Sequence, residues 1–301
     1  MRIRNFAQLI EVARQKEAPR VAVAAADQVQ TLVAVCRARE MDLAYPILVG
    51  DEGAIRGLAA QEGLSLDGLD IVHQPQPRLA AQEAVHLVTD GMADLIMNGR
   101  AQPGDLLRAV LARESGLRMG RLLTDVSVFE IPGFDRLIFV SDIGVIISPT
   151  LEQKVGIVQN AIDVARALGV ERPRVALLSA TEMVNPKIPT SLDASNLAKM
   201  ADRGQIKGGI VDGPLALDNA ISPQSAAIKG IQSPVAGQAD ILIAPDIETG
   251  NLLAKAITYF AGGKMASVVV GARCPLVMPS RADPPESKLV SLALAIVIRG
   301  V

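Results

Sequence analysis

The stretch from Gly271 to Glu286 holds the residues best suited to chemistry. An apolar run there stops at a hydroxyl, a guanidinium and a carboxylate, those of Ser280, Arg281 and Asp283. Two prolines and Glu286 follow, and then an apolar pattern with helical spacing. The pattern predicts a buried strand, a polar turn and a helix whose first turn contains proline and an acidic residue. An arginine beside a helix N-terminus favours an anionic group such as phosphate.

Three other loops combine many polar residues with glycine or proline. They span residues 179–194, 208–222 and 244–251. The second contains Asp212 and Asp218, and the third begins Ala-Pro-Asp and continues to Thr-Gly-Asn. Such residues also form the ordinary turns and loops that connect strands to helices. Long loops with this much specific polarity are nevertheless typical of functional sites.

Strand and helix signals alternate along most of the chain, which predicts an α/β fold with a parallel sheet. Strands are expected at residues 21–25, 46–49, 69–72, 94–97, 136–140, 175–178, 209–211, 241–244 and 268–270. Helices are expected at residues 5–16, 27–39, 78–89, 103–114, 151–168, 191–202 and 249–261. The segment 116–134 breaks the alternation with scattered glycine, proline and charge, so we interpret it as a crossing between domains.

Small polar residues follow many of the predicted strands. They are Asn98, Asp142, Ser179, Asp212, Asp246 and Ser280. Ligands bind outside the carboxyl ends of strands in open parallel sheets, so these residues predict a polar cleft along one edge. For each one taken singly, helix capping or turn formation is the favoured explanation, whereas the cleft explains the set as a whole better.

Composition narrows the function classes. The chain has 301 residues, which is enough for two domains. Its formal net charge is −2, so it lacks the positive electrostatic potential that would attract nucleic acid. With no Trp, two Tyr and five Phe, an aromatic platform for bases is not expected. Two distant cysteines favour a reducing compartment, and no signal sequence or membrane-length apolar run is found, so we expect a cytoplasmic protein without membrane contact.

Common catalytic motifs are missing. No G-x-G-x-x-G follows a strand, and Gly263-Lys264 lacks the upstream glycine of a phosphate-binding P-loop. The two histidines, His73 and His86, have no cysteine cluster near them, so we expect no metal site. There is no G-x-S-x-G, and Cys274 lies within an apolar run, where a buried, inert thiol is the simplest interpretation.

Three short motifs in order suggest a family. They are Asp212-Gly213-Pro214 with Asp218-Asn219-Ala220, Pro245-Asp246 with Thr249-Gly250-Asn251, and Ser280-Arg281. Together they resemble the phosphate acetyl/butyryltransferase family over nearly the whole chain. The ending Ser-Arg-Ala-Asp and the compact length look closer to the butyryltransferase branch.

The resemblance implies reversible transfer of a short acyl group between coenzyme A and inorganic phosphate. Coenzyme A is then a substrate, the partners are acyl-CoA and phosphate or acyl phosphate, and neither a bound cofactor nor a covalent enzyme intermediate is implied. Butyryl or a similar group is the first expectation, and acetyl is the alternative.

The resemblance also implies a fold of the isocitrate/isopropylmalate dehydrogenase type, with two three-layer α/β domains and a cleft between them. Residues 1–127 plus 270–301 would form domain I, and residues 128–269 would form domain II, inserted into it. A homodimer or higher homo-oligomer is expected.

Roles carry over residue by residue. Ser280 and Arg281 match the family's Ser-Arg pair, and Arg281 is expected to hold the phosphoryl group and to balance charge as the thiolate attacks. Arg108 resembles a second arginine that binds the acyl phosphate, with a solvated helix residue as the alternative. The matching residues expected to bind substrate are Asp212, Asn219, Asp246, Thr249, Gly250 and Asn251.

The general base is where the match fails. The acetyltransferase branch has a catalytic Asp seven positions after the serine, and this chain has Ser287 there. We expect Asp283 to accept the thiol proton, with Glu286 as the other candidate; an ordinary first-turn helix residue is the simpler role for Glu286.

Two other classes of function remain open. NAD- and metal-dependent dehydrogenases share the implied fold, but Asp212 and Asp218 are only a partial imitation of their metal-binding carboxylates. A non-catalytic protein that binds acyl-CoA or phosphate is the third possibility. Turnover of acyl-CoA with phosphate separates these classes.

Overall fold

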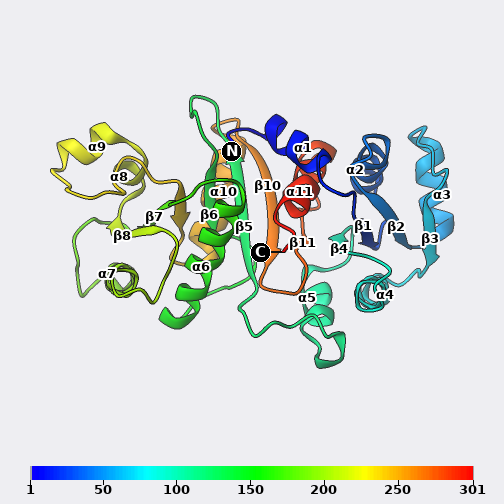
Figure 1. Cartoon of the computed structure of the whole chain (residues 1–301), viewed down its shortest axis with the longest axis horizontal. Coiled ribbons are helices and arrows are strands. Elements are labelled where there is room, and N and C mark those ends of the chain that lie inside the picture. The colour runs from blue at the N-terminus through cyan, green and yellow to red at the C-terminus, as the bar shows by residue number, and fades with distance from the viewer. Residues whose placement is uncertain (1, 301) are drawn as a thin grey trace. The chain divides into compact units, whose positions relative to one another are not determined.

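The computed structural model describes residues 2–300, which form a mixed α/β structure of two compact units. Unit 1 consists of residues 2–5 and Leu122–Met265, and unit 2 consists of Phe6–Arg121 and Ala266–Gly300. The chain thus leaves unit 2 after Arg121 and returns to it at Ala266. Each unit has its own sheet region with helices packed on it (Figure 1).

The strands of unit 2 lie in the order β3-β2-β1-β4-β11-β10. Their bounds are β1 Arg20–Ala24, β2 Tyr45–Gly50, β3 Asp70–His73, β4 Leu95–Asn98, β10 Lys264–Val270 and β11 Leu276–Val277. All neighbouring pairs from β3 to β11 are parallel, so the loops after β1, β4 and β11 leave the same edge. β10, which begins at the boundary between the units, runs antiparallel to β11.

Helices cover both sides of this sheet. Their bounds are α1 Phe6–Arg14, α2 Val29–Glu40, α3 Glu52–Gln61, α4 Pro77–Thr89, α5 Pro103–Leu111, the short 3-10 helix η1 Arg113–Ser115 and α11 Pro285–Val297. Helix α11 packs against α1 and α2, whereas α5 packs against α4. Figure 1 shows α2 and α4 on opposite sides of β1 and β2.

The strands of unit 1 lie in the order β5-β6-β9-β7-β8. Their bounds are β5 Thr124–Glu130, β6 Ile138–Ser141, β7 Arg174–Leu178, β8 Ile210–Leu215 and β9 Ile241–Ile243. The helices are α6 Leu151–Ala167, α7 Pro189–Asp202, α8 Leu217–Ile221, α9 Pro223–Ile228 and α10 Ile247–Tyr259. The strands β6, β9, β7 and β8 are parallel, and β5 is antiparallel to β6.

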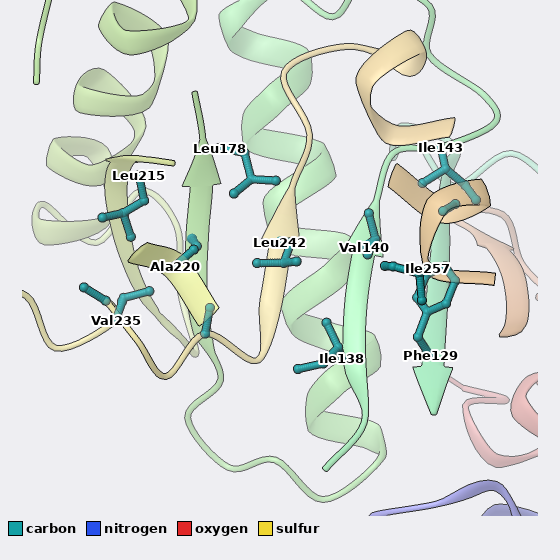
Figure 2. Close-up of a cluster of buried hydrophobic side chains, with 14 of the residues drawn as sticks. Phe129, Ile138, Val140, Ile143, Leu178, Leu215, Ala220, Val235, Leu242 and Ile257 are labelled. Atoms are coloured by element: carbon teal, nitrogen blue, oxygen red, sulfur yellow. The ribbon is translucent and has the colours of Figure 1, made fainter. Parts of the chain in front are cut away.

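A continuous apolar cluster fills one face of the unit 1 sheet. Phe129, Val140 and Leu242 project from neighbouring strands into a layer closed by Ile257 of α10 (Figure 2). Aliphatic side chains dominate this layer because the sequence offers few aromatic residues. Burial of such side chains supplies the main favourable term in folding, so this core fixes where the loops at the sheet edge begin.

Several element predictions are confirmed and some are wrong. The strand, turn and helix predicted at 271–296 are β11, a turn and α11, which begins at Pro285. The irregular segment predicted at 116–134 contains the buried strand β5, and α3, α8 and α9 were not predicted. Asp212 does not end a strand, because β8 continues through it to Leu215. The sheet is mixed and not wholly parallel, since β5 and β10 run against their neighbours β6 and β11.

None of the helices within residues 2–300 has both the length and the apolar character needed to cross a membrane.

Candidate active site

The turn between β11 and α11 holds Ser280, Arg281 and Asp283 in a fixed shape. The main-chain N–H of Ser280 donates to Asp283 Oδ2 at 2.8 Å, and the N–H of Asp283 donates back to the Ser280 carbonyl at 3.1 Å. Ser280 and Arg281 are exposed, while Asp283 is buried. The turn therefore presents a hydroxyl and a guanidinium to solvent and keeps its carboxylate inside.

A buried lysine that the sequence reasoning missed supports this turn. The side chain of Lys288, in the first turns of α11, is 0% exposed and its Nζ donates to the Ser280 carbonyl at 3.0 Å. Burial lowers the pKa of Lys288, and the charge of Asp283 acts in the opposite direction. The sequence could have predicted that Lys288 is buried, because it lies at helical spacing from Ser291, Leu292 and Ala295 on an apolar face.

Glu286 is held differently. Its carboxylate accepts a hydrogen bond from Arg37 Nη1 at 2.8 Å, and the side chain is 67% exposed. Its own backbone N–H and the Arg37 guanidinium hold the pKa of Glu286 below its ordinary value. A solvated, paired carboxylate with a lowered pKa is a poor proton acceptor.

Arg281 lies beside the loop that follows β4. Its Nη2 donates to the main-chain carbonyl of Arg100 at 3.2 Å, and Gln28 Nε2 donates to the Arg281 carbonyl at 3.2 Å. β4 and β11 are parallel neighbours, which brings the residues after Asn98 and after Val277 together. The two loops meet through Arg281 and the Arg100 carbonyl. Asn98 itself is buried and donates to the Ala101 carbonyl, so a polar cleft containing Asn98 and Ser280 stays a prediction.

Arg108 lies on α5 of the same unit. Its side chain is 78% exposed and forms an ion pair with Asp105 one turn earlier. This is the arrangement expected of a solvated helix residue, and an arginine whose side chain is itself mostly exposed remains able to reorient toward an anion.

In unit 1, the residues of the Pro-Asp-Ile-Glu-Thr-Gly-Asn motif form the start of α10. Asp246 is the N-cap, and its Oδ1 accepts the N–H of Thr249 at 2.8 Å. A side chain on Gly250 would place its Cβ 2.3 Å from the Asp142 carbonyl oxygen, so α10 packs closely on that loop. Asn251 Nδ2 donates to the Ile143 carbonyl at 3.3 Å, which ties the motif to the same loop.

The loop after β6 is built around a buried carboxylate. Asp142 Oδ1 accepts the N–H groups of Gly144 and Val145, each at 2.8 Å, and Oδ2 accepts the N–H of Asp125 at 3.2 Å. Burial raises the pKa of Asp142, while these N–H groups lower it. The residue thus shapes the loop that the motif at the start of α10 packs against.

The residues of the other unit 1 motif, Asp212-Gly213-Pro214 with Asp218-Asn219-Ala220, lie in two different environments. Asp212 Oδ1 accepts the N–H of Gly213 at 2.8 Å within β8. Asn219 is 0% exposed, and its Nδ2 donates to Glu182 Oε2 at 3.2 Å. Lys229 contacts both Glu182 and Asp218, at 3.3 and 3.1 Å. Asn219 and Asp218 therefore belong to one charged cluster, and Asp212 lies in the strand before it.

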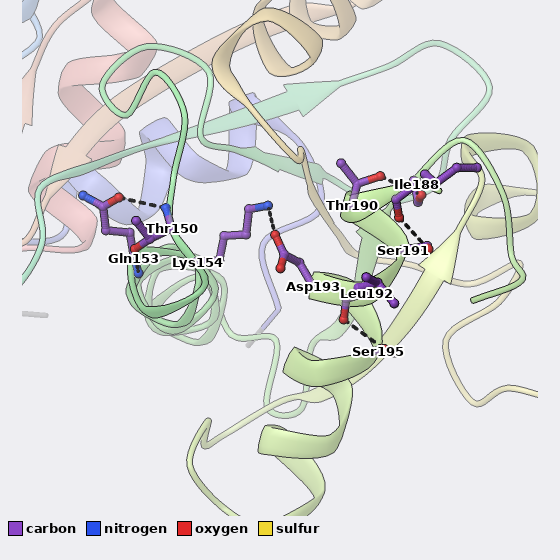
Figure 3. Close-up of polar contacts among 10 residues, drawn as sticks. Thr150, Gln153, Lys154, Ile188, Thr190, Ser191, Leu192, Asp193 and Ser195 are labelled. Carbon is purple, nitrogen blue, oxygen red and sulfur yellow. Dashed lines mark hydrogen bonds and ion pairs between the residues drawn. The ribbon is translucent and has the colours of Figure 1, made fainter. Parts of the chain in front are cut away.

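Unit 1 also contains a buried lysine, Lys154, which lines a small cavity. Lys154 Nζ of α6 donates to Asp193 Oδ2 of α7 at 2.7 Å (Figure 3). The cavity, of about 10 Å³, also touches Thr190, Ala244 and Pro245. That volume corresponds to roughly one water molecule, and the ion pair beside it links α6 to α7. Within residues 2–300, no group of three or more His, Cys, Asp or Glu side chains is arranged to hold a metal ion.

The sequence matches one family description over most of its length. The pattern of the phosphate acetyl/butaryl transferase family matches residues 74–296. The chain is 45% identical over 298 residues to a phosphate butyryltransferase of Clostridium acetobutylicum, covering 99% of both chains. It is 46% identical over 289 residues to a phosphate acetyltransferase of Thermotoga maritima, covering 96% of this chain and 98% of that one.

A solved structure of a phosphotransacylase is also similar to this chain. The crystal structure of a branched-chain phosphotransacylase from Enterococcus faecalis matches with a TM-score of 0.81 at 33% identity, over 93% of this chain and 99% of that chain. The motifs around Asp212, Asp246 and Ser280 all fall within the matched residues. On the family pattern and near full-length relatives, this chain belongs to the phosphate acetyl/butaryl transferase family.

Proposed function

We propose that this protein transfers a short-chain acyl group reversibly between coenzyme A and inorganic phosphate. Coenzyme A is a substrate in this proposal, and no bound cofactor is needed. Butyryl or a similar group is the preferred acyl chain, with acetyl as the alternative, since relatives named for both reactions are similarly identical to the chain.

The observation that carries the proposal is the exposed Ser280-Arg281 pair at the carboxyl edge of a parallel sheet. Asp283 and Lys288 hold the turn from within, so the pair is presented in one conformation. A preorganised guanidinium is the type of group that stabilises charge on a transferring phosphate without reorganisation during the reaction.

The reaction then proceeds in one displacement. The coenzyme A thiolate attacks the carbonyl carbon of the acyl phosphate, forming the C–S bond. The C–O bond to phosphate breaks, and phosphate leaves with the bonding electron pair. Arg281 balances the charge on the phosphate, Ser280 donates a hydrogen bond to it or to the oxyanion, and Asp283 takes the thiol proton.

The chain's own thiols support transfer without a covalent enzyme intermediate. Both cysteines are buried, and desolvation raises the pKa of Cys36 to about 11 and that of Cys274 to about 12. A thiol acts as a nucleophile through its thiolate, which is scarce at neutral pH when the pKa is this high. Neither residue is suited to carry the acyl group.

The remaining predicted residues complete the proposal. In this proposal Arg108 of α5 binds a phosphate group, and the substrate-binding residues of unit 1 are Asp212, Asn219, Asp246, Thr249, Gly250 and Asn251. We propose a cytoplasmic homodimer or higher homo-oligomer with a two-domain, dehydrogenase-type fold, divided near residues 128 and 270.

The test follows thiol release from acetyl-, propionyl- and butyryl-CoA in the presence of phosphate. Arg281→Ala is expected to lower kcat/KM by about 10²–10³, the loss typical of one missing donor to transition-state charge. Arg39→Ala is the matched control, because Arg39 is near the end of α2, at the opposite edge of the sheet. No thiol release by the natural protein with any of the three substrates contradicts the proposed function.

The same assay separates the two candidate bases. Asp283→Asn is expected to lower kcat by about 10²–10⁴, the usual contribution of a general base. Glu286→Gln is the matched control, since it removes a carboxylate three residues away that is paired with Arg37 in solvent. A larger loss for Glu286→Gln than for Asp283→Asn reverses the assignment.

A further inference from the structure

The loops after β1 and β4 are locked together, which fixes Arg100. The N–H groups of Gly99 and Arg100 donate to the carbonyls of Ala24 and Ala25 at 2.8 and 2.9 Å. A side chain at Gly99 would bring its Cβ within 2.2 Å of the Ala25 carbonyl oxygen, so only glycine permits this approach. The main chain of Arg100 therefore has little freedom relative to the loop after β1.

That loop carries a buried carboxylate aimed at Arg100. Asp27 is 6% exposed at its side chain, and its Oδ2 accepts the Nε–H of Arg100. Its Oδ1 is buried without a hydrogen-bond partner among the described residues. Ala25, two residues earlier, has φ of 53°, a left-handed conformation that costs about 1 kcal/mol or more in a non-glycine residue. Strained backbone and an enclosed, half-satisfied carboxylate are features that cluster at functional sites.

Arg100 and Arg281 are neighbours in this arrangement. The guanidinium of Arg281 reaches the Arg100 carbonyl, and Gln28, next to Asp27, holds the Arg281 carbonyl. The Arg100 side chain is 39% exposed, so its guanidinium is held on one side and open to solvent on another. Asp27 and Asp283 are the two carboxylates in these contacts, and Lys288 adds an ammonium to the two guanidinium groups. Three positive charges against two negative ones leave one positive charge uncompensated at this edge, which favours an anion there.

We infer that Arg100 and Arg281 together bind a phosphate group of a substrate, and that Asp27 is the residue that positions Arg100. The inference rests on the proposed function and adds a binding residue that the sequence motifs do not mark. The phosphate is that of inorganic or acyl phosphate, or one of those in coenzyme A. Each guanidinium can donate two parallel hydrogen bonds to a phosphate, and Arg100 adds a second positive charge that Arg281 alone does not provide.

The test is steady-state kinetics on the full-length protein, varying phosphate and acyl-CoA separately. Arg100→Ala is expected to raise one KM by about tenfold or more, the loss of one charge-assisted hydrogen bond. A rise in the KM for phosphate assigns the site to the reacting phosphate, and a rise confined to acyl-CoA assigns it to coenzyme A. Arg39→Ala is the control, and an unchanged KM for both substrates in Arg100→Ala overturns the inference.

Asp27→Asn tests the positioning role. It is expected to raise the same KM as Arg100→Ala while leaving kcat less affected, and to add nothing further in the Asp27→Asn, Arg100→Ala double variant. Additive effects in the double variant overturn the positioning role. Circular dichroism and thermal melting confirm that each variant is folded.

A binding measurement keeps the inference separate from the proposed function. Calorimetric titration with inorganic phosphate is expected to give weaker binding to Arg100→Ala than to the natural protein, whether or not thiol is released. Equal binding contradicts the phosphate arm. Absence of turnover by the natural protein, with phosphate binding that still depends on Arg100, contradicts the proposed function alone.

Discussion

The residues around Ser280 show how a short polar turn is made rigid. Its carbonyl accepts a hydrogen bond from the buried Lys288 ammonium, and its N–H donates one to the Asp283 carboxylate, so both main-chain groups of Ser280 have charged partners. Hydrogen bonds to charged groups are stronger than neutral ones, particularly when buried. The main chain that carries the exposed side chains of Ser280 and Arg281 is thus held by two buried residues, Asp283 and Lys288.

Lys288 should make stability depend on pH in a specific direction. Its pKa in the folded protein is below the 10.5 of an exposed lysine, so the unfolded chain binds more protons between these two values. The free energy of unfolding of the natural protein should therefore rise with pH through that interval, relative to Lys288→Met. Urea unfolding from pH 7 to pH 10 measures the difference.

The control for this experiment is Lys199→Met, which removes an exposed lysine of α7. If the free energy of unfolding of the natural protein falls relative to that of Lys288→Met as pH rises, or if Lys199→Met shows the same pH dependence relative to the natural protein as Lys288→Met, the buried position of Lys288 is not the cause.

At the scale of elements, close backbone approach decides which motif residues are replaceable. The start of α10 lies against the loop at Asp142, and Gly250 is the point of contact. By contrast Gly57, in α3, has nothing within 4 Å of the position of an added Cβ. Both are helical glycines, so they differ mainly in what surrounds them.

Gly250→Ala is expected to destabilise the protein by about 1–3 kcal/mol, because the added methyl group forces α10 and the loop apart. Gly57→Ala is expected to stabilise it by about 0.5–1 kcal/mol, since alanine loses less conformational freedom in a helix. Thermal and urea unfolding of both variants give the comparison. Equal and favourable effects would show that the start of α10 has room to adjust.

A comparison of the predicted with the observed element bounds shows which elements the sequence pattern predicts. The periodic segments that became α4, α6 and α7 were predicted within a few residues. The strand β5 was missed because its buried residues are interrupted by Asp125 and Ser127, whose polar groups are hydrogen-bonded inside the fold. Local pattern carries no information about such distant partners.

At the scale of the whole molecule, the Asp240 carboxylate contacts three segments of unit 1 that are far apart in the sequence. It is buried, and its Oδ1 accepts from Arg2 Nη2 at 2.7 Å while its Oδ2 accepts the N–H of Arg174 at 3.0 Å. Arg136 Nε lies 3.6 Å from Oδ1. The carboxylate thus joins the start of the chain to β7 and to the segment before β6.

Asp240→Asn is expected to lower the free energy of unfolding by about 1.5–3 kcal/mol, because the new amide nitrogen faces one of two donors and leaves it unpaired. Asp135→Asn is the control, since Asp135 is exposed and contacts the same Arg136. Urea unfolding reports both. A loss in Asp135→Asn as large as in Asp240→Asn would mean that burial of the carboxylate is unimportant.

The sequence by itself determined the α/β class and most of the periodic helices, and it was enough to predict an anion site at Ser280-Arg281. These follow from local rules, because helical spacing, proline position and charge act over a few residues. The family resemblance likewise rests on short motifs that are contiguous in the chain.

Only the tertiary structure decided which residues stand beside that turn. Lys288 is buried because α11 is packed between its neighbours, and Arg100 meets Arg281 because β4 and β11 are adjacent although their sequence positions are far apart. Strand order is set by long-range packing, and the sequence pattern of a strand does not name its neighbour. For that reason Ser280-Arg281 could be predicted as a site, whereas its buried support and its second arginine could not.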